Sequence, residues 1–204
     1  SSDADFEAAF AAFLAQKREA AADVDAAVRE IIADVRNRGD EALIGLSAKF
    51  DRVDLAKAGI RITADELAAA ESRCDPAALD ALRFARERIA GHHRRQLPAD
   101  DRYTDPTGAE LGSRWTAVES VGLYVPGGLA SYPSSVLMNA VPAQVAGVPR
   151  IAVAVPAPGG EINPLVLAAL RICGVGEVYR VGGAQAVAAL AYGTATIPAG
   201  LKLL

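Results

Sequence analysis

The chain has 204 residues, of which 51% are hydrophobic, and its formal net charge at pH 7 is −4. This length and apolar content are enough to bury a core, in one large domain or two small ones. The acidic balance, without any run of Lys or Arg, argues against nucleic acid as a partner. No stretch reaches the apolar length of a membrane span, and the acidic start is unlike a secretory signal, so we expect a cytoplasmic protein without a membrane partner.

The two cysteines, Cys74 and Cys173, lie far apart in the sequence. Neither belongs to a CxxC pair or to a Cys/His spacing that is typical of zinc sites. We therefore expect two structural thiols and no disulfide.

Charge is distributed unevenly along the chain, because only six charged residues follow Val121. Solvated helices are rich in charge, whereas a sheet covered on both faces is almost purely apolar. The pattern predicts two regions: an α-rich N-terminal region at residues 1–120, which would be part of the first domain, and a second unit at residues 121–204.

The first region begins with an amphipathic helix, whose apolar positions recur at helical spacing from Val24 to Val35 and which should stop at Gly39. A second helix is predicted over residues 40–50. The segment "IRIT" then favours a short strand, and its Thr63 begins a capping box that Glu66 closes.

Asp75 followed by Pro76 predicts an N-cap with proline in the first turn, which opens a helix to about His93. Beyond it, "RYTDPTGAELGSRWTAVE" is typical of two strands around an Asp-Pro-Thr-Gly turn.

The second region repeats a strand and a helix three times. The predicted strands are "VGLYV", "RIAVAV" and "EVYRV", and the helices are "YPSSVLMNAVPAQVAG", "NPLVLAALRICG" and "AQAVAALAYG". Three successive units with apolar strands indicate an α/β fold in which parallel strands are joined by right-handed crossovers. We expect an incomplete Rossmann-like unit over residues 121–204.

Ligands of such sheets gather where strands end, because the turns expose backbone N–H groups and helix N-termini. Two turns qualify. The first runs from Tyr124 to Gly127 and Gly128, and the second holds Gly182, Gly183 and Gln185. Each Gly-Gly pair taken alone favours a tight turn over a ligand site, since neither matches G-x-G-x-x-G and no Walker motif is present.

Other polar and aromatic residues favour structural roles. His92 and His93 are expected to stabilise a helix C-terminus through their partial positive charge. Three serines are expected to cap a helix. Two aromatic residues are expected in the core, and two acid pairs in solvated or capping positions. These residues are Ser131, Ser134, Ser135, Trp115, Tyr132, Asp100-Asp101 and Asp40-Glu41.

Two long segments carry a family resemblance: "VGLYVPGGLASYPSSVLMNAVPAQVAGV" and "EINPLVLAALRICGVGEVYRVGGAQAVAALAYGT". Together with "RGDEAL", "SAKFD", "HRRQLP" and "GSRWTAVESVGLYVPGG", they resemble the histidinol dehydrogenases over nearly all of residues 3–198. The match is long and its spacing is intact, so it is more specific than a short glycine motif.

The resemblance implies an NAD- and zinc-dependent oxidoreductase that converts L-histidinol through an aldehyde to L-histidine. It also implies an intertwined homodimer with two incomplete Rossmann-like domains. Tyr124 and Gln185 correspond to NAD-contacting positions, with Gly127, Gly128, Gly182 and Gly183 as supporting turn residues.

The family pattern places the zinc ligands, the acid/base pair and most substrate contacts in a second half, beyond residue 204. The resemblance therefore implies the N-terminal half of the enzyme, with no catalytic residue and no metal ligand of its own, inactive when isolated. In the family another strand, followed by an NAD-contacting asparagine, would come after Pro198, where this chain has "AGLKLL". Two alternatives stay open: a non-catalytic NAD-binding or interaction module, and an unrelated α/β nucleotide-binding domain.

Overall fold

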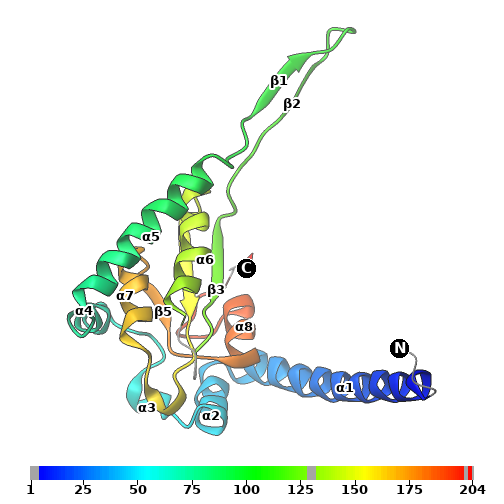
Figure 1. The fold of residues 1–204 in the computed structure, drawn as a ribbon, viewed down its shortest axis with the longest axis vertical. Helices are drawn as coiled ribbons and strands as arrows, with labels where there is room; N and C mark the ends of the chain where they lie inside the picture. Colours follow the sequence, from blue (N-terminus) through cyan, green and yellow to red (C-terminus); the bar gives the residue numbers. More distant parts are fainter. Residues whose placement is uncertain (1–4, 128–131, 200–201, 204) are drawn as a thin grey trace.

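A parallel sheet covered by helices on both faces forms the body of the molecule, and two arms project from it (Figure 1). The computed structural model describes residues 5–127, 132–199 and 202–203. This arrangement confirms the predicted α/β class.

The central sheet has four parallel strands in the order β5-β4-β3-β6. Their bounds are β3 Ser120–Tyr124, β4 Arg150–Ala154, β5 Glu177–Tyr179 and β6 Lys202–Leu203. The first strand of the unit thus lies between the second and the fourth, which is the order of a Rossmann sheet. In such a sheet the connections reverse direction between β3 and β6.

The strand β6 corrects one expectation from the sequence. The tail "AGLKLL" was expected to depart from the family's next strand, but Lys202 and Leu203 pair in parallel with Val121 and Gly122. The pairing gives backbone groups at this edge of β3 their hydrogen-bond partners, which a few residues of any composition can do.

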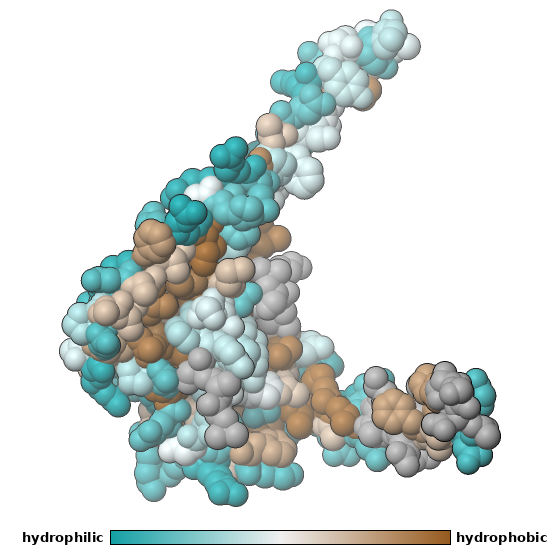
Figure 2. All heavy atoms as spheres, viewed as in Figure 1, coloured by the Kyte–Doolittle hydropathy of each residue, from teal (hydrophilic) through white to brown (hydrophobic). Residues whose placement is uncertain are grey.

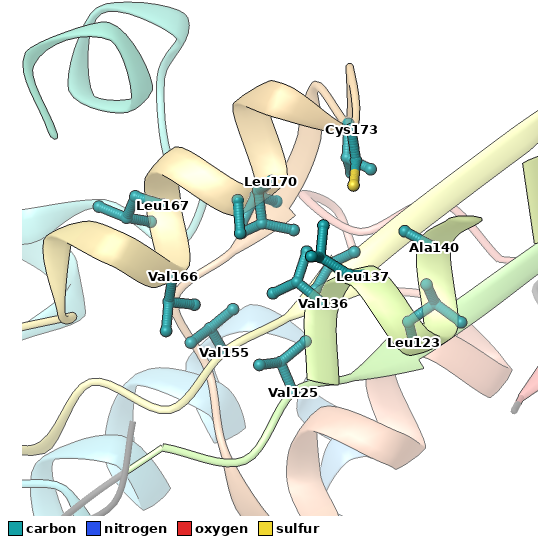
Figure 3. Packing of buried hydrophobic residues seen from close by; sticks show 14 of the residues in the cluster. Leu123, Val125, Val136, Leu137, Ala140, Val155, Val166, Leu167, Leu170 and Cys173 are labelled. Atoms are coloured by element: carbon teal, nitrogen blue, oxygen red, sulfur yellow. The ribbon is translucent and has the colours of Figure 1, made fainter. Parts of the chain in front are cut away.

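Side chains of the strands alternate between two cores, one on each face of the sheet. Val153 and Val155 belong to the first core, whereas Ala152 and Ala154 belong to the second. Four helices cover the first core: α4 Ala64–Ser72, α5 Pro76–Arg94, α6 Pro133–Val145 and α7 Pro164–Ile172. Figure 3 shows residues of α6 and α7 that pack in this core. The second core lies under the end of α1 Phe6–Arg38, α2 Asp40–Phe50, α3 Leu55–Ala58 and α8 Gly183–Tyr192. Both cores therefore use residues from either side of position 120, and the domain boundary there stays a prediction.

The starts of α4, α5 and α7 agree with the local signals in the sequence. Thr63 and Glu66 form the predicted capping box of α4. Asp75 and Asn163 cap α5 and α7 by accepting hydrogen bonds from Ala77 and Leu165, with a proline in each first turn. Gly39, at φ +55°, separates α1 from α2. A short 3-10 helix, η1 Pro158–Gly160, precedes α7.

The strand predicted for "IRIT" is reduced to a single antiparallel bridge, between Arg61 and Tyr179. The N–H of Ile62 donates to the carbonyl of Val178 beside it. The ladder extends no further because Thr63 already begins the cap of α4.

The two arms leave the body in different directions (Figure 1). The helical arm, residues 6–24, is the start of α1. The hairpin arm, residues 100–118, holds the antiparallel strands β1 Asp101–Thr104 and β2 Glu110–Ser113, which flank the predicted turn. Figure 2 shows polar or weakly hydropathic residues over most of the hairpin arm. None of the described helices is both long enough and apolar enough to cross a bilayer.

Candidate functional site

Three strands end together at one edge of the sheet, and the turns that follow them pack against Pro156. A Cβ on Gly127 would lie 2.8 Å from the carbonyl oxygen of Pro156, and a Cβ on Gly182 would lie 2.6 Å from its Cβ. Both distances are shorter than a van der Waals contact allows. The turns after β3, β4 and β5 therefore touch one another through backbone and proline atoms.

Tyr124 connects the two turns that the sequence singled out. Its half-buried side chain leaves the end of β3 toward the second core, and its hydroxyl accepts a 3.1 Å hydrogen bond from the N–H of Gly183. The N-terminus of α8 has no side-chain cap of its own. A phenol oxygen from another strand therefore occupies this end of the helix, where the partial charge is positive.

Gln185 lies in the first turn of α8, next to the same contact. Its side chain folds back over the turn, because its Oε1 lies 2.7 Å from the place of a Cβ on Gly183. Gly183 has φ +64°, a left-handed conformation that glycine adopts without strain. The residue is only 2% exposed, so an amide with two donors and an acceptor is held at the strand ends.

The predicted site residues are thus brought together, apart from Gly128, which lies outside the described residues, as does Ser131. Tyr124 and Gln185 flank one contact at one sheet edge, rather than opposite sides of the domain. That removes the ground on which an unrelated α/β domain would have been preferred.

Several structural roles expected from the sequence are wrong. Ser134 and Ser135 do not cap α6, because Pro133 starts this helix and Tyr132, without a side-chain bond, is its N-cap. Trp115 and Tyr132 are 63% and 47% exposed rather than buried. Trp115 lies in the hairpin arm, just after β2, where the described residues have no core beside them.

The acid pairs lie in the solvated or helix-start positions predicted from the sequence, since Asp40 and Glu41 stand in the first turn of α2 and Asp100 and Asp101 are exposed. Asp40 also makes a tertiary contact, because its carboxylate accepts a 2.6 Å hydrogen bond from the hydroxyl of Thr196. Asp100 accepts a bond from the N–H of Trp115 at the base of the hairpin arm.

The two histidines lie in the last turn of α5, as expected. Although neighbours on a helix diverge, the ring centroids of His92 and His93 are only 5.3 Å apart, and the side chain of Gln96 contacts both rings. Among the described residues, no group of three or more His, Cys, Asp or Glu side chains is placed to hold a metal ion.

Both cysteines are free thiols, in agreement with the sequence. Burial in the first core raises the pKa of Cys173 to about 11. Burial likewise raises the pKa of Cys74, whose Sγ donates to the carbonyl of Ala70.

A pocket of about 730 Å³ opens beside the site and was not predicted. It lies between α4 and α7 and shares Gly127 and Pro156 with the turns described above. Its polar lining includes Glu66, Asn163 and Arg180. The sequence carried one signal for it, a single arginine inside the apolar run "VYRVGG".

The strand order and the glycine turns that meet at the strand ends define an α/β protein of the Rossmann-like class. The histidinol dehydrogenase family model matches residues 14–204. A histidinol dehydrogenase of Mesorhizobium japonicum is 65% identical over all of this chain and 47% of its own length, and one of Bradyrhizobium diazoefficiens is 64% identical over the same shares. The chain belongs to the histidinol dehydrogenase family.

A solved structure supports the same assignment. The crystal structure of histidinol dehydrogenase from Elizabethkingia anophelis superposes with a TM-score of 0.84 at 32% identity, over 88% of this chain and 41% of that one. The chain spans about half the length of the curated relatives it matches.

Proposed function

We propose that this chain provides an NAD-binding region of an enzyme that oxidises L-histidinol through the aldehyde to L-histidine. The observation that carries the proposal is the hydrogen bond between the Tyr124 hydroxyl and Gly183, which joins two strand-end turns into one site beside Gln185. Family membership supplies the reaction, and the site supplies the place for the cofactor.

The donor set of the site fits a dinucleotide. The N-terminus of α8 favours a negative charge such as a phosphate. The ring of Tyr124 offers a flat apolar surface, and the buried amide of Gln185 offers both donor and acceptor. Gly127, Gly182 and Gly183, together with Gly128, would support the turns. NAD, when bound, would accept the hydride that leaves the alcohol.

These residues bind and orient, and none of them is proposed to move a proton. Tyr124 would release Gly183 when an anionic group takes its place at the helix N-terminus. Gln185 would then hold polar atoms of the ligand while the packed turns keep water away from its side chain. The family resemblance also implies zinc, but the described residues do not form a ligand set for it.

The experiment measures NAD affinity by isothermal titration calorimetry, in the native-length protein that carries this sequence. Gln185→Ala should weaken binding about tenfold, the effect of one lost polar contact worth ~1.4 kcal/mol. Tyr124→Phe should change affinity by a smaller factor, since the ring is kept. Tyr192→Phe, at the other end of α8, and Gln96→Ala, on α5, are matched controls that should bind NAD normally.

If Gln185→Ala and both controls bind NAD equally well, the proposed site is wrong. Histidinol turnover in the same protein separates the enzyme from a non-catalytic NAD-binding module. An NAD-binding protein that leaves histidinol unchanged would favour the module.

We infer further that the arms contact a second copy of the chain, in line with the homodimer expected for the family. Phe6 and Phe10 stack with ring centroids 5.6 Å apart, and both are at least 39% exposed. Apolar side chains gathered on a projecting helix favour a protein interface. Replacing Phe6, Phe10 and Phe13 by serine should shift sedimentation toward the monomer, and an unchanged dimer would exclude this role for the helical arm.

A further inference from the structure

Arg180 occupies an unusual place for a charged side chain. It follows β5 directly and stands two residues before the Gly182-Gly183 turn, yet it is only 9% exposed. Its backbone N–H donates a 2.7 Å hydrogen bond to the carbonyl of Ile60. Both the main chain and the side chain of this residue are therefore fixed to the segment that leads from α3 to α4.

The guanidinium holds that segment at several points. One terminal nitrogen donates to the carbonyl oxygens of Ala58, at 2.6 Å, and Gly59, at 3.2 Å. The other forms an ion pair with Glu66, whose second carboxylate oxygen accepts the N–H of Thr63. Arg180 thus connects the end of α3 and the start of α4 to β5. This strand leads into the Gly182-Gly183 turn, which is called the nucleotide turn below.

Stability alone does not account for a buried charge in this position. The Nε of Arg180 is buried and has no hydrogen-bond partner in the described part of the chain. The Arg180 side chain is 10% exposed whereas that of Glu66 is 39% exposed, so the pair takes mainly the guanidinium out of water, and this desolvation offsets part of the attraction between the partners. A different benefit must keep an incompletely satisfied arginine here.

A second arginine, Arg150 at the start of the neighbouring strand β4, gives the contrast, because it pairs with Glu177 at the opposite end of β5 from Arg180. Arg150 binds Glu177 through two nitrogens, at 3.0 and 2.6 Å, and Glu177 also accepts the hydroxyl of Tyr179. Its remaining nitrogen donates to the carbonyl of Ala199. This pair is partly exposed and fully hydrogen-bonded, as expected for a contact that stabilises the fold.

The path from Arg180 to the candidate site is short and tightly packed. Val181 is 1% exposed, and Gly182 leaves no room for a Cβ against Pro156. Gly183 follows at once and donates to the Tyr124 hydroxyl. A shift of Arg180 would therefore move the N–H groups of the turn, with no loose segment between them to absorb it.

We propose that Arg180, together with Glu66, is a positioning residue that sets the nucleotide turn for NAD. This inference rests on the proposed NAD site and adds two residues that line the neighbouring pocket and act on the turn through its packing. The pair acts on ligand affinity, whereas the Arg150–Glu177 pair acts on stability.

The test compares Arg180→Met with Arg150→Met in the native-length protein, by NAD titration, thermal unfolding and hydrogen exchange. Arg180→Met should weaken NAD binding on the order of tenfold to a hundredfold, since small displacements of a binding group have effects of this size. It should also raise amide exchange at residues 182–185, and it should lower Tm because the carbonyls of Ala58 and Gly59 and the carboxylate of Glu66 lose their partner. Arg150→Met should lower Tm and leave NAD affinity and exchange at the turn unchanged.

Two variants of Glu66 test the pair itself. Glu66→Gln keeps one acceptor oxygen, which can still accept from Arg180, and loses only the bond from Thr63, so its affinity should stay within about threefold of normal. Glu66→Ala loses both and should resemble Arg180→Met. A fall in Tm without a change in affinity or exchange for Arg180→Met would overturn the inference.

The readouts also separate this inference from the proposed function. If the parent protein binds no NAD, the proposed function fails, and exchange at residues 182–185 still decides whether Arg180 positions the turn. If the parent binds NAD and only the exchange responds to Arg180→Met, the link from Arg180 to affinity is wrong.

Discussion

The body buries many of its apolar side chains, whereas the two arms expose theirs. In the body, residues such as Leu170 and Leu123 are 0% exposed and pack on other parts of the same chain (Figure 3). In the arms, Phe13 and Leu111 are 59% and 45% exposed. The body therefore obtains its burial from this chain, whereas the arms need a second surface to obtain any.

The difference shows that secondary structure and burial are separate outcomes. α1 is one continuous helix of 33 residues, and among the side chains that the structure describes its apolar face is buried near its C-terminal end, where it meets α8 and α2. Val35 is 1% exposed and Val24 is 62% exposed, although both occupy the same predicted face. Helical periodicity fixes which residues share a face, and tertiary contacts decide whether the face is covered.

The largest effect is expected from a core leucine. Leu170→Ala should lower the free energy of unfolding by about 2–5 kcal/mol, through lost burial and the remaining cavity. Leu111→Ala, the matched change in the hairpin arm, should stay within about 0.5 kcal/mol. Urea unfolding measures both, and equal effects would contradict the division between body and arms.

A smaller effect follows from the buried thiol of the body. Burial raises the pKa of Cys173 from 9.0 to about 11, so the unfolded chain loses this proton at lower pH than the folded chain. The contribution of the protonated Cys173 thiol to the free energy of unfolding is fully present below pH 9 and is lost as pH rises toward 11. The loss amounts to about 1.3 kcal/mol between pH 8 and pH 10. Cys173→Ala should be less stable at pH 8 and should show a shallower alkaline loss; parallel pH profiles would refute the assignment.

A helix cap in the body and a cap position in the helical arm should also differ in their effect on stability. Asn163 accepts the N–H of Leu165 at the start of α7, so Asn163→Ala should destabilise by about 1 kcal/mol. Asp5 stands at the N-cap of α1 without a side-chain bond. Asp5→Ala should therefore leave Tm unchanged, and a fall as large as that of Asn163→Ala would show that the helical arm is not independent.

The smallest effect belongs to a surface ion pair of α1. Asp25 and Arg29 are 2.7 Å apart, with side chains 61% and 77% exposed. Such pairs are screened by water and salt, so Arg29→Gln should shift Tm by less than about 1 °C. A larger, salt-dependent shift in calorimetry would mean that this part of α1 is buried against a partner.

Local signals were read correctly from the sequence where one or two residues decide the outcome. Asp75 and Asn163 each precede a proline and start a helix as predicted. The same rule explains the failure at α6, where Pro133 begins the helix ahead of the expected serines. Trp115 was misjudged because residue type indicates preference for a core but not whether a core lies nearby.

The candidate site was predictable in part. Tyr124 and Gln185 follow strands of a repeating β-α pattern, and parallel strand ends meet at one edge. Arg180 was missed because its partner Glu66 lies 114 residues earlier in the chain. No local sequence pattern indicates a contact between residues so far apart in the chain. The packing of α4 beside the sheet creates the Arg180–Glu66 contact.

The contact of Gly127 and Gly182 with Pro156 has a consequence for how this sequence can vary. Gly182 has φ −122°, which any residue can adopt, so its side chain is excluded by space alone. Gly182→Ala would become acceptable only where Pro156 is also replaced by a smaller residue. Substitutions at the three strand ends are therefore coupled. The effect of a change at one of them depends on which residues the other two carry.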